Sequence, residues 1–434
     1  MLSTFSIRQS HIALVDCQKF YASCHSVFSE WTRHIPTVVL SNNDGCIIAI
    51  NDKAKKFGFK MGQNFFEATA ELRRLGVRVF SSNYTFYGDI SDRVVDGLRH
   101  FSPKIEVYSI DECFMEFSHY DYPDLSSVGH QLVHNIFRWV RMPVTFAAGN
   151  GKGPAKIASY FAKKDPALKG VLHLRTDKQL DAALREIPVQ KIWYIGPKSA
   201  KKLRKVGIKT GAEFRDADSC WIKKMFTVVG WRLQRELRGY PCIPLELKRK
   251  SKKGIGHTRG FRKMVDNKRD LRAALASFTA RAALKLRQEK SCVNKVSILI
   301  ETNPFRDDLP QYRNLKTVSL NVATNSSIEI CSHVFDLLNQ IYRDGYKYKR
   351  AGVLFDDLVP TNTVQLNLFD QYPRKKDAKA MGILDKINST QGRDTLWIGS
   401  QELYERDSTW HMAQEFKSPC YTTKWSDIPS VSLK

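Results

Sequence analysis

Two adjacent carboxylates, Asp111 and Glu112, stand in a break between two short apolar stretches of residues 104–117. Apolar side chains alternate at Ile105 and Val107 before the break, and a period of two is typical of strands, so we expect a two-stranded hairpin. Adjacent carboxylates repel each other, and a divalent cation held at the strand end would neutralise them. A solvated turn tip explains the pair equally well, and this stretch alone leaves both interpretations open.

A third carboxylate strengthens the metal hypothesis. Residues 11–16 read His-Ile-Ala-Leu-Val-Asp, which predicts a buried strand that ends at Asp16. Two aromatic residues, Phe20 and Tyr21, follow at an expected helix start. Such a strand end is also common in structural positions, but beside Asp111 and Glu112 it offers a further acidic side chain. Three carboxylates on neighbouring strands can hold two Mg²⁺ ions for phosphoryl transfer.

Length and charge restrict the class of protein. The chain has 434 residues, which predicts two to four domains, and 42% hydrophobic residues suit globular folding. A formal net charge of +25 indicates a polyanionic partner, with nucleic acid favoured over a membrane surface. We expect no membrane span, because the longest N-terminal apolar run is residues 12–15. The nine cysteines form no Cys-x-x-Cys pair, which favours a reducing cytoplasm.

Four stretches together resemble one enzyme family. They are Asp16 with residues 20–23 (Phe-Tyr-Ala-Ser), residues 109–112 (Ser-Ile-Asp-Glu), residues 38–46 (Val-Val-Leu-Ser-Asn-Asn-Asp-Gly-Cys) and residues 80–84 (Phe-Ser-Ser-Asn-Tyr). Their order and spacing resemble Y-family translesion DNA polymerases. The resemblance is to the UmuC type in particular, to which the catalytic subunit of bacterial DNA polymerase V belongs.

This resemblance implies an α+β multidomain fold shaped like a right hand, with palm, small fingers, a helix-hairpin-helix thumb and a βαββαβ little finger. The expected domains are the palm (1–29 and 83–172), fingers (30–82), thumb (173–247), basic linker (248–254), little finger (255–360) and a C-terminal tail (361–434).

The resemblance also assigns the carboxylates. It implies that Asp16, Asp111 and Glu112 are catalytic and bind two Mg²⁺ ions, with Mn²⁺ as an alternative. Cys17 stands where the family supplies a main-chain carbonyl as a further metal ligand, so its thiol is not required. One ion would activate the primer 3′-hydroxyl and the other would neutralise the triphosphate.

The nucleotide site is expected around the aromatic pair. Phe20 and Tyr21 match the residues under the incoming sugar, with Tyr21 as the steric gate against a 2′-hydroxyl; ordinary core packing is the alternative. Lys55 stands on the expected triphosphate-facing helix where many relatives have Arg. Asp52, by contrast, stands where many have Tyr, and a carboxylate there would repel phosphate. His25 replaces the usual Glu and is interpreted as a surface histidine.

Two lysines follow the expected strand after residue 144. Lys163 matches the family lysine that reaches the triphosphate, in preference to a solvated helix face. Residues 149–154 (Gly-Asn-Gly-Lys-Gly-Pro) look like a phosphate loop, but Gly153 follows Lys152 where such a loop needs a hydroxyl residue. Function and solvation therefore stay equally open for Lys152.

Residues 187–207 predict a helix-hairpin-helix, in which a short helix ends at Trp193 and a second helix opens at Pro197. Main-chain N–H groups after Gly196, with Lys198 and Lys201, could hold DNA phosphates without reading sequence. A helical pair without function is the alternative.

Residues 248–254 are basic and turn-rich, which favours a linker, with or without DNA contact. Strand-like and helical patterns then alternate to residue 358 in the order βαββαβ, as in the little finger domain. Several basic side chains there are candidate contacts to the DNA backbone, and the pattern does not rank them: Arg259, Arg281, Arg287, Lys295 and Lys316.

We expect a docking sequence in the tail between Pro360 and Pro373, because apolar side chains exposed in a linker usually mark a partner. Residues 365–370 read Gln-Leu-Asn-Leu-Phe-Asp and resemble the bacterial sliding-clamp-binding motif. The motif residues are Gln365, Leu366, Leu368 and Phe369. A last edge strand that packs on the little finger is the alternative.

We therefore expect an error-prone, template-directed DNA polymerase for translesion synthesis in the SOS response, located in the cytoplasm. Its expected partners are primer-template DNA, deoxynucleoside triphosphates and the sliding clamp, and the resemblance adds a processed UmuD-type protein and a RecA filament. A non-catalytic DNA-binding relative and a two-metal nuclease are the alternatives. The nuclease leaves the aromatic pair unexplained.

Overall fold

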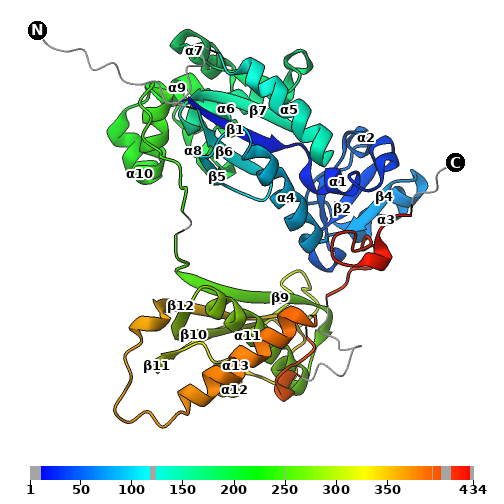
Figure 1. Ribbon diagram of the computed structural model, residues 1–434, viewed down its shortest axis with the longest axis vertical. Helices are drawn as coiled ribbons and strands as arrows, with labels where there is room; N and C mark the ends of the chain where they lie inside the picture. The colour runs from blue at the N-terminus through cyan, green and yellow to red at the C-terminus, as the bar shows by residue number, and fades with distance from the viewer. Residues whose placement is uncertain (1–10, 118–123, 249, 393, 402–411, 431–434) are drawn as a thin grey trace, which may run out of the picture. The chain divides into compact units, whose positions relative to one another are not determined.

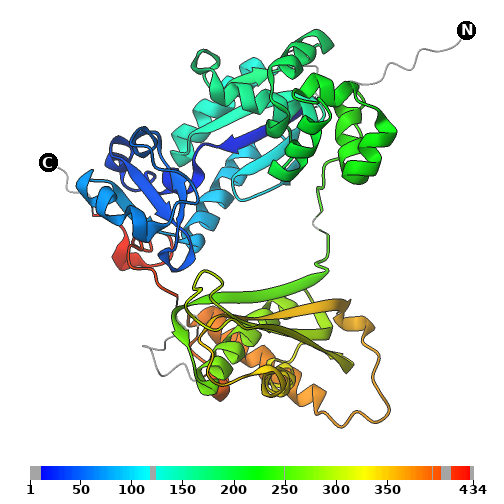
Figure 2. The same cartoon turned by 180° about the vertical axis from the view of Figure 1, so that it is seen from behind.

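The structure is a computed structural model that describes residues 11–117, 124–248, 250–392, 394–401 and 412–430. The chain forms two compact units, drawn from opposite sides in Figures 1 and 2. Unit 1 comprises Met1–Arg249 and Glu415–Lys434, and unit 2 comprises Lys250–Gln414. The chain thus leaves unit 1 once and returns to it at its C-terminal segment.

A five-stranded sheet in the order β5-β6-β1-β7-β8 forms the centre of unit 1. Strand β1 is antiparallel to both β6 and β7, whereas β7 and β8 are parallel. The strands are β1 (His11–Cys17), β5 (Ile105–Val107), β6 (Glu112–Glu116), β7 (Val144–Asn150) and β8 (Val171–His173). The predicted hairpin and the strand ending beside Asp16 are both present.

Helices cover both faces of this sheet (Figure 1), as the alternation of side chains along β1 requires. Ala13 and Val15 belong to the core formed with α4 (Tyr84–Leu98) and α5 (Ser126–Val140). Ile12 and Leu14 pack on the other face, with Ala155 of α6 (Lys152–Lys164). Because both faces are buried, the strand is almost continuously apolar up to Asp16.

A second sheet, in the order β3-β2-β4, lies within the predicted fingers. Its core contains Val38, Leu40 and Ile47 from the sheet and Ala68 and Leu72 from a helix. The elements are β2 (Thr37–Leu40), β3 (Ile47–Ile50), β4 (Arg78–Ser81), α2 (Asp52–Lys56) and α3 (Phe65–Arg74), preceded by α1 (Phe20–His25). The side chain of Asn51 accepts a hydrogen bond from the Ala54 amide and thereby starts α2.

The helices of the predicted thumb complete unit 1. They are α7 (Asp177–Glu186), α8 (Pro197–Lys205), α9 (Gly211–Asp216) and α10 (Ser219–Leu237). Helix α8 begins at Pro197, as expected. The short helix expected to end at Trp193 is instead one 3-10 turn, Val189–Lys191, which follows Pro188. The Ile192 amide donates to the Val189 carbonyl, an i→i+3 bond that closes a 3-10 turn, and three residues are too few to close an i→i+4 bond.

Unit 2 is a four-stranded sheet in the order β11-β10-β12-β9 with two helices. Along the chain the elements are β9 (Gly254–Val265), α11 (Lys268–Gln288), β10 (Ser291–Thr302), β11 (Arg313–Thr324), α12 (Ser327–Ile341) and β12 (Tyr348–Pro360). This confirms the predicted βαββαβ order. Its core joins residues of both helices, such as Leu275 and Val334, to the inner face of the sheet.

The tail contains a helix that the sequence analysis missed, α13 (Arg374–Thr390). Arg287 of α11 donates to both carboxylate oxygens of Asp385 on α13, at 2.6 and 2.8 Å, and fastens the helix to unit 2. The segment from Glu415 onward then packs on unit 1, so the tail docks at two places. Among the described helices, none is long and apolar enough to cross a membrane.

Candidate active site

The register of the central sheet brings the three predicted carboxylates together. Asp16 and Glu112 are directly paired across β1 and β6. The Cys17 amide donates to the Asp111 carbonyl at 2.8 Å, which holds the turn before β6 against the end of β1. Asp16, Asp111 and Glu112 therefore meet at one end of the sheet, although they are far apart in the sequence.

Each carboxylate is engaged by a neighbouring side chain. The ammonium group of Lys163 lies 2.5 Å from Asp16 Oδ2, and that of Lys156 lies 2.7 and 2.8 Å from the two oxygens of Glu112. The Ser109 hydroxyl donates to Asp111 Oδ1 at 2.6 Å. Both lysines come from α6, so the helix on one face of the sheet supplies the positive charge. Lys163 is exposed and at the same time paired with a site carboxylate, so its predicted contact with the triphosphate stays a prediction.

Lys156 is a site residue that the sequence analysis did not single out. Its ammonium group lies over the rings of Tyr108, Phe114 and Trp193, at 5.1, 5.7 and 5.6 Å from their centroids. The spacing of the lysines in the sequence could have indicated that Lys156 faces the site. Lys156 follows Lys152 by four residues and precedes Lys163 by seven, and these intervals place all three on one side of a helix.

Burial gives the pair of facing carboxylates unusual electrostatics. It raises the pKa of Asp16 to about 7, although the charge of Lys163 opposes the rise. Burial also acts to raise the pKa of Glu112, but hydrogen bonds with Asp16 and Lys156 outweigh it, so that this pKa is lowered. Two acidic groups that face each other in a poorly hydrated place require nearby positive charge.

The same features test whether divalent cations suit the site. Carboxylate oxygens are the ligands that Mg²⁺ and Mn²⁺ prefer, and the lysines already show that cationic charge is stabilised here. In the part of the chain that the structure describes, no three acidic, histidine or cysteine side chains converge on one point as metal ligands. The lysines hold the carboxylates instead. The chemistry of these donors fits divalent cations, although their geometry in the structure is that of ion pairs with lysine.

The Cys17 thiol takes no part in this arrangement. The residue is buried, and burial raises the pKa of its thiol well above the usual range, which keeps it protonated. Its backbone, in contrast, lies between the strand ends that carry Asp16 and Asp111. Binding of a metal by the main-chain carbonyl of Cys17, for which the thiol is not required, stays a prediction.

An aromatic group lies beside the carboxylates. Phe20 is buried, while the half-buried Tyr21 has its ring 4.8 Å from that of Tyr87 and 6.0 Å from that of Tyr84. Burial and the neighbouring Tyr84 raise the pKa of Tyr21, with a further contribution from the charge of Asp111. Tyr21 thus has one side packed on the core and lies close to a site carboxylate.

The interpretation of His25 as a surface residue is wrong. His25 is 2% exposed, and its ring stacks on Phe80 at 3.9 Å. Its Nε2 lies 2.9 Å from the Tyr87 hydroxyl, so it holds the ring on which Tyr21 packs. Burial lowers the pKa of His25 to about 3 and keeps it neutral. The aromatic residues that surround it, Phe80, Phe86 and Tyr87, are distant in the sequence, which hid this contact.

Lys55 lies on the exposed surface of α2, within the predicted fingers. The unexpected carboxylate of Asp52, on the same helix, is paired with the ammonium group of Lys19. Lys19 directly precedes α1 and therefore connects this helix of the fingers to the segment that carries Phe20 and Tyr21. This ion pair explains why a carboxylate stands at position 52 without any contact between Asp52 and phosphate.

Lys152, for which function and solvation had stayed open, has a structural role. It is 2% exposed, and its ammonium group lies 2.5 Å from Glu106 of β5. Glu106 also accepts from the Glu246 amide at 2.6 Å, in the segment that leaves α10. Gly151, with φ of 116°, makes the tight entry to α6 that resembled a phosphate loop.

The predicted DNA-contacting residues of the thumb lie on the surface. Gly196, Lys198 and Lys201 are exposed at the start of α8, and a Cβ added to Gly196 would meet nothing within 4 Å. The first amide groups of this helix are therefore open on the exposed side, as binding of a phosphate group requires.

In unit 2 the candidate basic residues differ in their surroundings. Arg259 lies near His257 and donates to the Met412 sulfur at 3.0 Å. Arg281 is paired with Asp394, whereas Lys316 is exposed on β11. Arg287 is paired with Asp385 of α13.

The predicted clamp-binding segment is exposed and irregular. Strand β12 ends at Pro360, and the exposed fractions are 66% for Leu366, 92% for Leu368 and 83% for Phe369. Gln365 is exposed as well. The alternative, an edge strand packed on unit 2, is therefore wrong.

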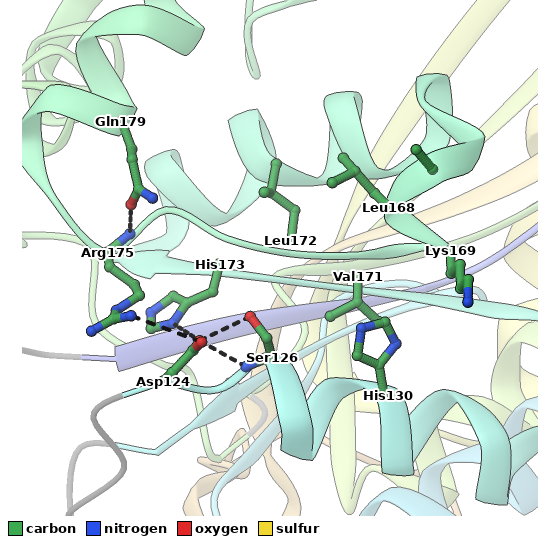
Figure 3. A pocket seen from close by; sticks show the side chains of 11 residues that line it. Asp124, Ser126, His130, Leu168, Lys169, Val171, Leu172, His173, Arg175 and Gln179 are labelled. Atoms are coloured by element: carbon green, nitrogen blue, oxygen red, sulfur yellow. Dashed lines mark hydrogen bonds and ion pairs between the residues drawn. The ribbon is translucent and has the colours of Figure 1, made fainter.

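A hollow of about 600 Å³ lies along α5 and β8, which is an edge strand of the central sheet (Figure 3). Asp124 is one of the residues that line it, and its carboxylate accepts hydrogen bonds from the amide and hydroxyl of Ser126. The same carboxylate lies 3.3 Å from His173 Nδ1. These contacts join the first residue of α5 to β8 through Asp124. Strand β7 lies between β8 and β1, and none of Asp16, Asp111 and Glu112 lines the hollow, so it is separate from the carboxylates.

Comparison with solved structures identifies the class of protein that has this fold. The fold is that of Y-family DNA polymerases: a Dbh-based Y-family polymerase chimera matches with a TM-score of 0.63 at 19% identity, over 81% of this chain and 99% of its own. An insertion ternary complex of Dbh DNA polymerase matches with a TM-score of 0.54 and the same coverage.

The sequence comparisons narrow this class. Residues 15–160 match the impB/mucB/samB family, and residues 252–368 match its C-terminal domain. Protein UmuC of Salmonella typhimurium is 38% identical over 96% of this chain and 99% of its own, and protein ImpB of the same organism is 36% identical over 97% and 99%. DNA polymerase IV of Clostridium acetobutylicum is 23% identical over 87% and 96%. The chain belongs to the impB/mucB/samB family. Residues 378–431 match a domain of unknown function.

Proposed function

We infer that this protein is a DNA-directed DNA polymerase that carries out error-prone translesion synthesis in the DNA damage response. The observation that carries this inference is the meeting of Asp16, Asp111 and Glu112 at one strand end, with Tyr21 beside them. Its relatives named UmuC and DNA polymerase IV support the same activity. Small fingers leave a nucleotide site that tolerates poorly shaped base pairs, which explains a loss of fidelity.

The three carboxylates and the main chain of Cys17 are proposed to hold two Mg²⁺ ions, or Mn²⁺ in their place. When bound, such ions would lower the pKa of the primer 3′-hydroxyl and neutralise the charge of the triphosphate. The protein contributes the strand register that brings Asp16 opposite Glu112 and the turn that adds Asp111.

Positive side chains around the carboxylates are proposed to bind the triphosphate. Lys163 is 41% exposed at its side chain, so its ammonium group is accessible from the site as well as paired with Asp16. Lys55 adds an exposed charge from the fingers. A lysine provides a point charge, which suits a flexible chain of phosphates.

Phe20 and Tyr21 are proposed to form the floor under the incoming sugar. Tyr21 is held from behind by Tyr87, whose own ring is buried and whose hydroxyl lies against His25. A ring supported in this way does not retreat when a 2′-hydroxyl approaches it. Selection of deoxynucleotides follows from that support.

Primer-template DNA is proposed to bind through its phosphates, without sequence readout. The net charge of +25 supplies the attraction, and the exposed start of α8 with Lys198 and Lys201 supplies one phosphate site. Arg259 is a proposed contact from unit 2.

Protein partners are proposed from exposed surface and family membership. The segment of Gln365, Leu366, Leu368 and Phe369 is proposed to bind the sliding clamp, because three apolar side chains protrude from irregular backbone there. Membership of a family that includes UmuC also supports a processed UmuD-type partner and a RecA filament.

The function is tested by primer extension with Asp111→Asn and Glu112→Gln. Either change removes a negative charge with little change of shape, so extension should fall by several orders of magnitude. Binding of primer-template DNA should change less than about threefold, because affinity comes mostly from contacts with phosphates. Glu116→Gln is the matched control, since this carboxylate lies at the other end of β6.

The templates are undamaged DNA and DNA with one abasic site. Near-normal extension by either site variant would overturn the proposed roles of the carboxylates. Shortening of the primer by the wild type would indicate the nuclease, and DNA binding with neither reaction would indicate a non-catalytic relative.

A further inference from the structure

The C-terminal segment, residues 415–428, is built into the fingers of unit 1. The Ser81 amide donates to the Phe416 carbonyl at 2.9 Å, and the Phe416 amide donates to the Ser81 hydroxyl at 2.9 Å. Since β4 is the edge strand of the fingers sheet, the segment extends hydrogen bonding beyond that edge. The Glu415 amide also donates to the buried Asp44 at 2.9 Å. Figures 1 and 2 both show this segment beside β4.

Past this attachment the segment reaches a group of aromatic side chains. Asn83, which caps α4, donates to the Ser418 hydroxyl at 3.2 Å. The ring of Tyr421 then stacks on Phe28 at 4.9 Å and 14° and meets Phe86 edge-on at 5.7 Å. Tyr421 is half-buried and closes the outer side of this group.

The aromatic group continues without a gap to the proposed steric gate. Phe86 is 6.0 Å from Tyr87, and Tyr87 is 4.8 Å from Tyr21. Phe86 and Tyr87 are 2% and 0% exposed, so neither has free space into which it could move. In close-packed interiors a missing neighbour on one side lets the remaining side chains shift toward it.

We propose that the C-terminal segment is the outer wall of the sugar pocket and that Tyr421 is a positioning residue for Tyr21. This inference rests on the proposed function, in which Tyr21 contacts the sugar of the incoming nucleotide. It gives a specific role to part of a region matched only to a domain of unknown function. Tyr421 touches no reacting atom and acts through Phe86 and Tyr87.

The test uses the full chain and compares Tyr421→Ala with Tyr421→Phe. The measurement is the ratio of kcat/KM for a ribonucleotide to that for the matching deoxynucleotide on one primer-template. Tyr421→Ala should raise this ratio about three- to tenfold, because the support of Tyr21 loosens. Tyr421→Phe keeps the ring and should leave the ratio within twofold of the wild type. Trp425→Ala is a control on the same segment, because Trp425 is 90% exposed.

A Tyr21→Ala variant distinguishes failure of the wall inference for Tyr421 from failure of the gate proposal for Tyr21. If Tyr21→Ala raises the ratio and Tyr421→Ala does not, the wall inference is wrong and the gate stands. If neither raises it, the gate proposal fails and the wall inference fails with it. Equal losses of kcat/KM for both nucleotides in Tyr421→Ala would mean that the segment serves only stability, which also overturns the inference. Should Tyr421→Ala not accumulate as folded protein, Tyr421→Leu retains apolar volume without the flat ring and carries the same expectations.

Discussion

Replacing Lys152 by Met should destabilise unit 1 in a manner that depends on pH. Met preserves the length of the side chain and removes only the ammonium group that faces Glu106. The carboxylate would then keep the Glu246 amide as a donor but lose its opposite charge, in a place where its side chain is 9% exposed. Breaking one partner of a buried ion pair typically costs about 3–5 kcal/mol.

Protonation of the unpaired carboxyl group reduces this cost. The folded variant can take up a proton to escape the buried charge, and uptake of a proton becomes easier as pH falls. The loss of unfolding free energy should therefore be about 3–5 kcal/mol at pH 7.5 and clearly smaller at pH 5.5. The sign follows because the folded variant binds a proton that the unfolded chain does not, so its stability falls as pH rises.

Urea unfolding at the two pH values, followed by tryptophan fluorescence, measures this difference. Lys164→Met is the matched control, because Lys164 is exposed on the same helix. The double variant Glu106→Gln with Lys152→Met should recover most of the loss, since no buried charge is left without a partner. A cost below 1 kcal/mol at pH 7.5, or one that does not shrink at pH 5.5, would refute the reasoning. At a permissive temperature the KM for nucleotide should stay within about threefold of the wild type.

Two further predictions concern His25 and the clamp segment. Because burial lowers the pKa of His25 to about 3, the unfolded chain takes up a proton below pH 6.5 that the folded chain refuses, and this single residue should remove about 2 kcal/mol of stability at pH 5. His25→Gln removes this group, so the variant should lose less unfolding free energy between pH 7.5 and pH 5 than the wild type does. Equal losses in the two proteins would contradict this. Replacing Leu368 and Phe369 by Ala should abolish binding to the sliding clamp in a surface-plasmon assay. Basal extension and the melting temperature should stay near wild type, because both side chains are more than four-fifths exposed, and a melting temperature lowered by several degrees would mean that the segment belongs to the core.

Local patterns predicted the parts of the fold whose causes are local. The alternation around residues 105–117 predicted the hairpin, and the order of strands and helices in unit 2 followed from their periodicity. The approach of Asp16 to Glu112 was a hypothesis from residue chemistry, and the resemblance then linked the two stretches. Neither periodicity nor spacing contains the register that pairs them.

The errors concern contacts between distant segments. His25 is buried by residues of β4 and α4, and Lys152 is paired with a residue of β5, so neither environment can be read from neighbouring residues. Helix α13 was missed because its residues are mostly polar and only Met381 is fully buried. Its stability comes instead from ion pairs such as Arg287 with Asp385, which leave no hydrophobic period in the sequence.

The return of the chain to unit 1 has a consequence for synthesis on the ribosome. Residues 250–414 must be translated between the main part of unit 1 and the segment that completes it. At ordinary elongation rates this interval is on the order of ten seconds, which is long compared with the folding of a domain. During that interval Phe28, Phe65 and Phe86 lack the side chains of Phe416 and Tyr421 that cover them in the finished protein. The nascent chain should therefore be a substrate for ribosome-associated chaperones until the last segment docks.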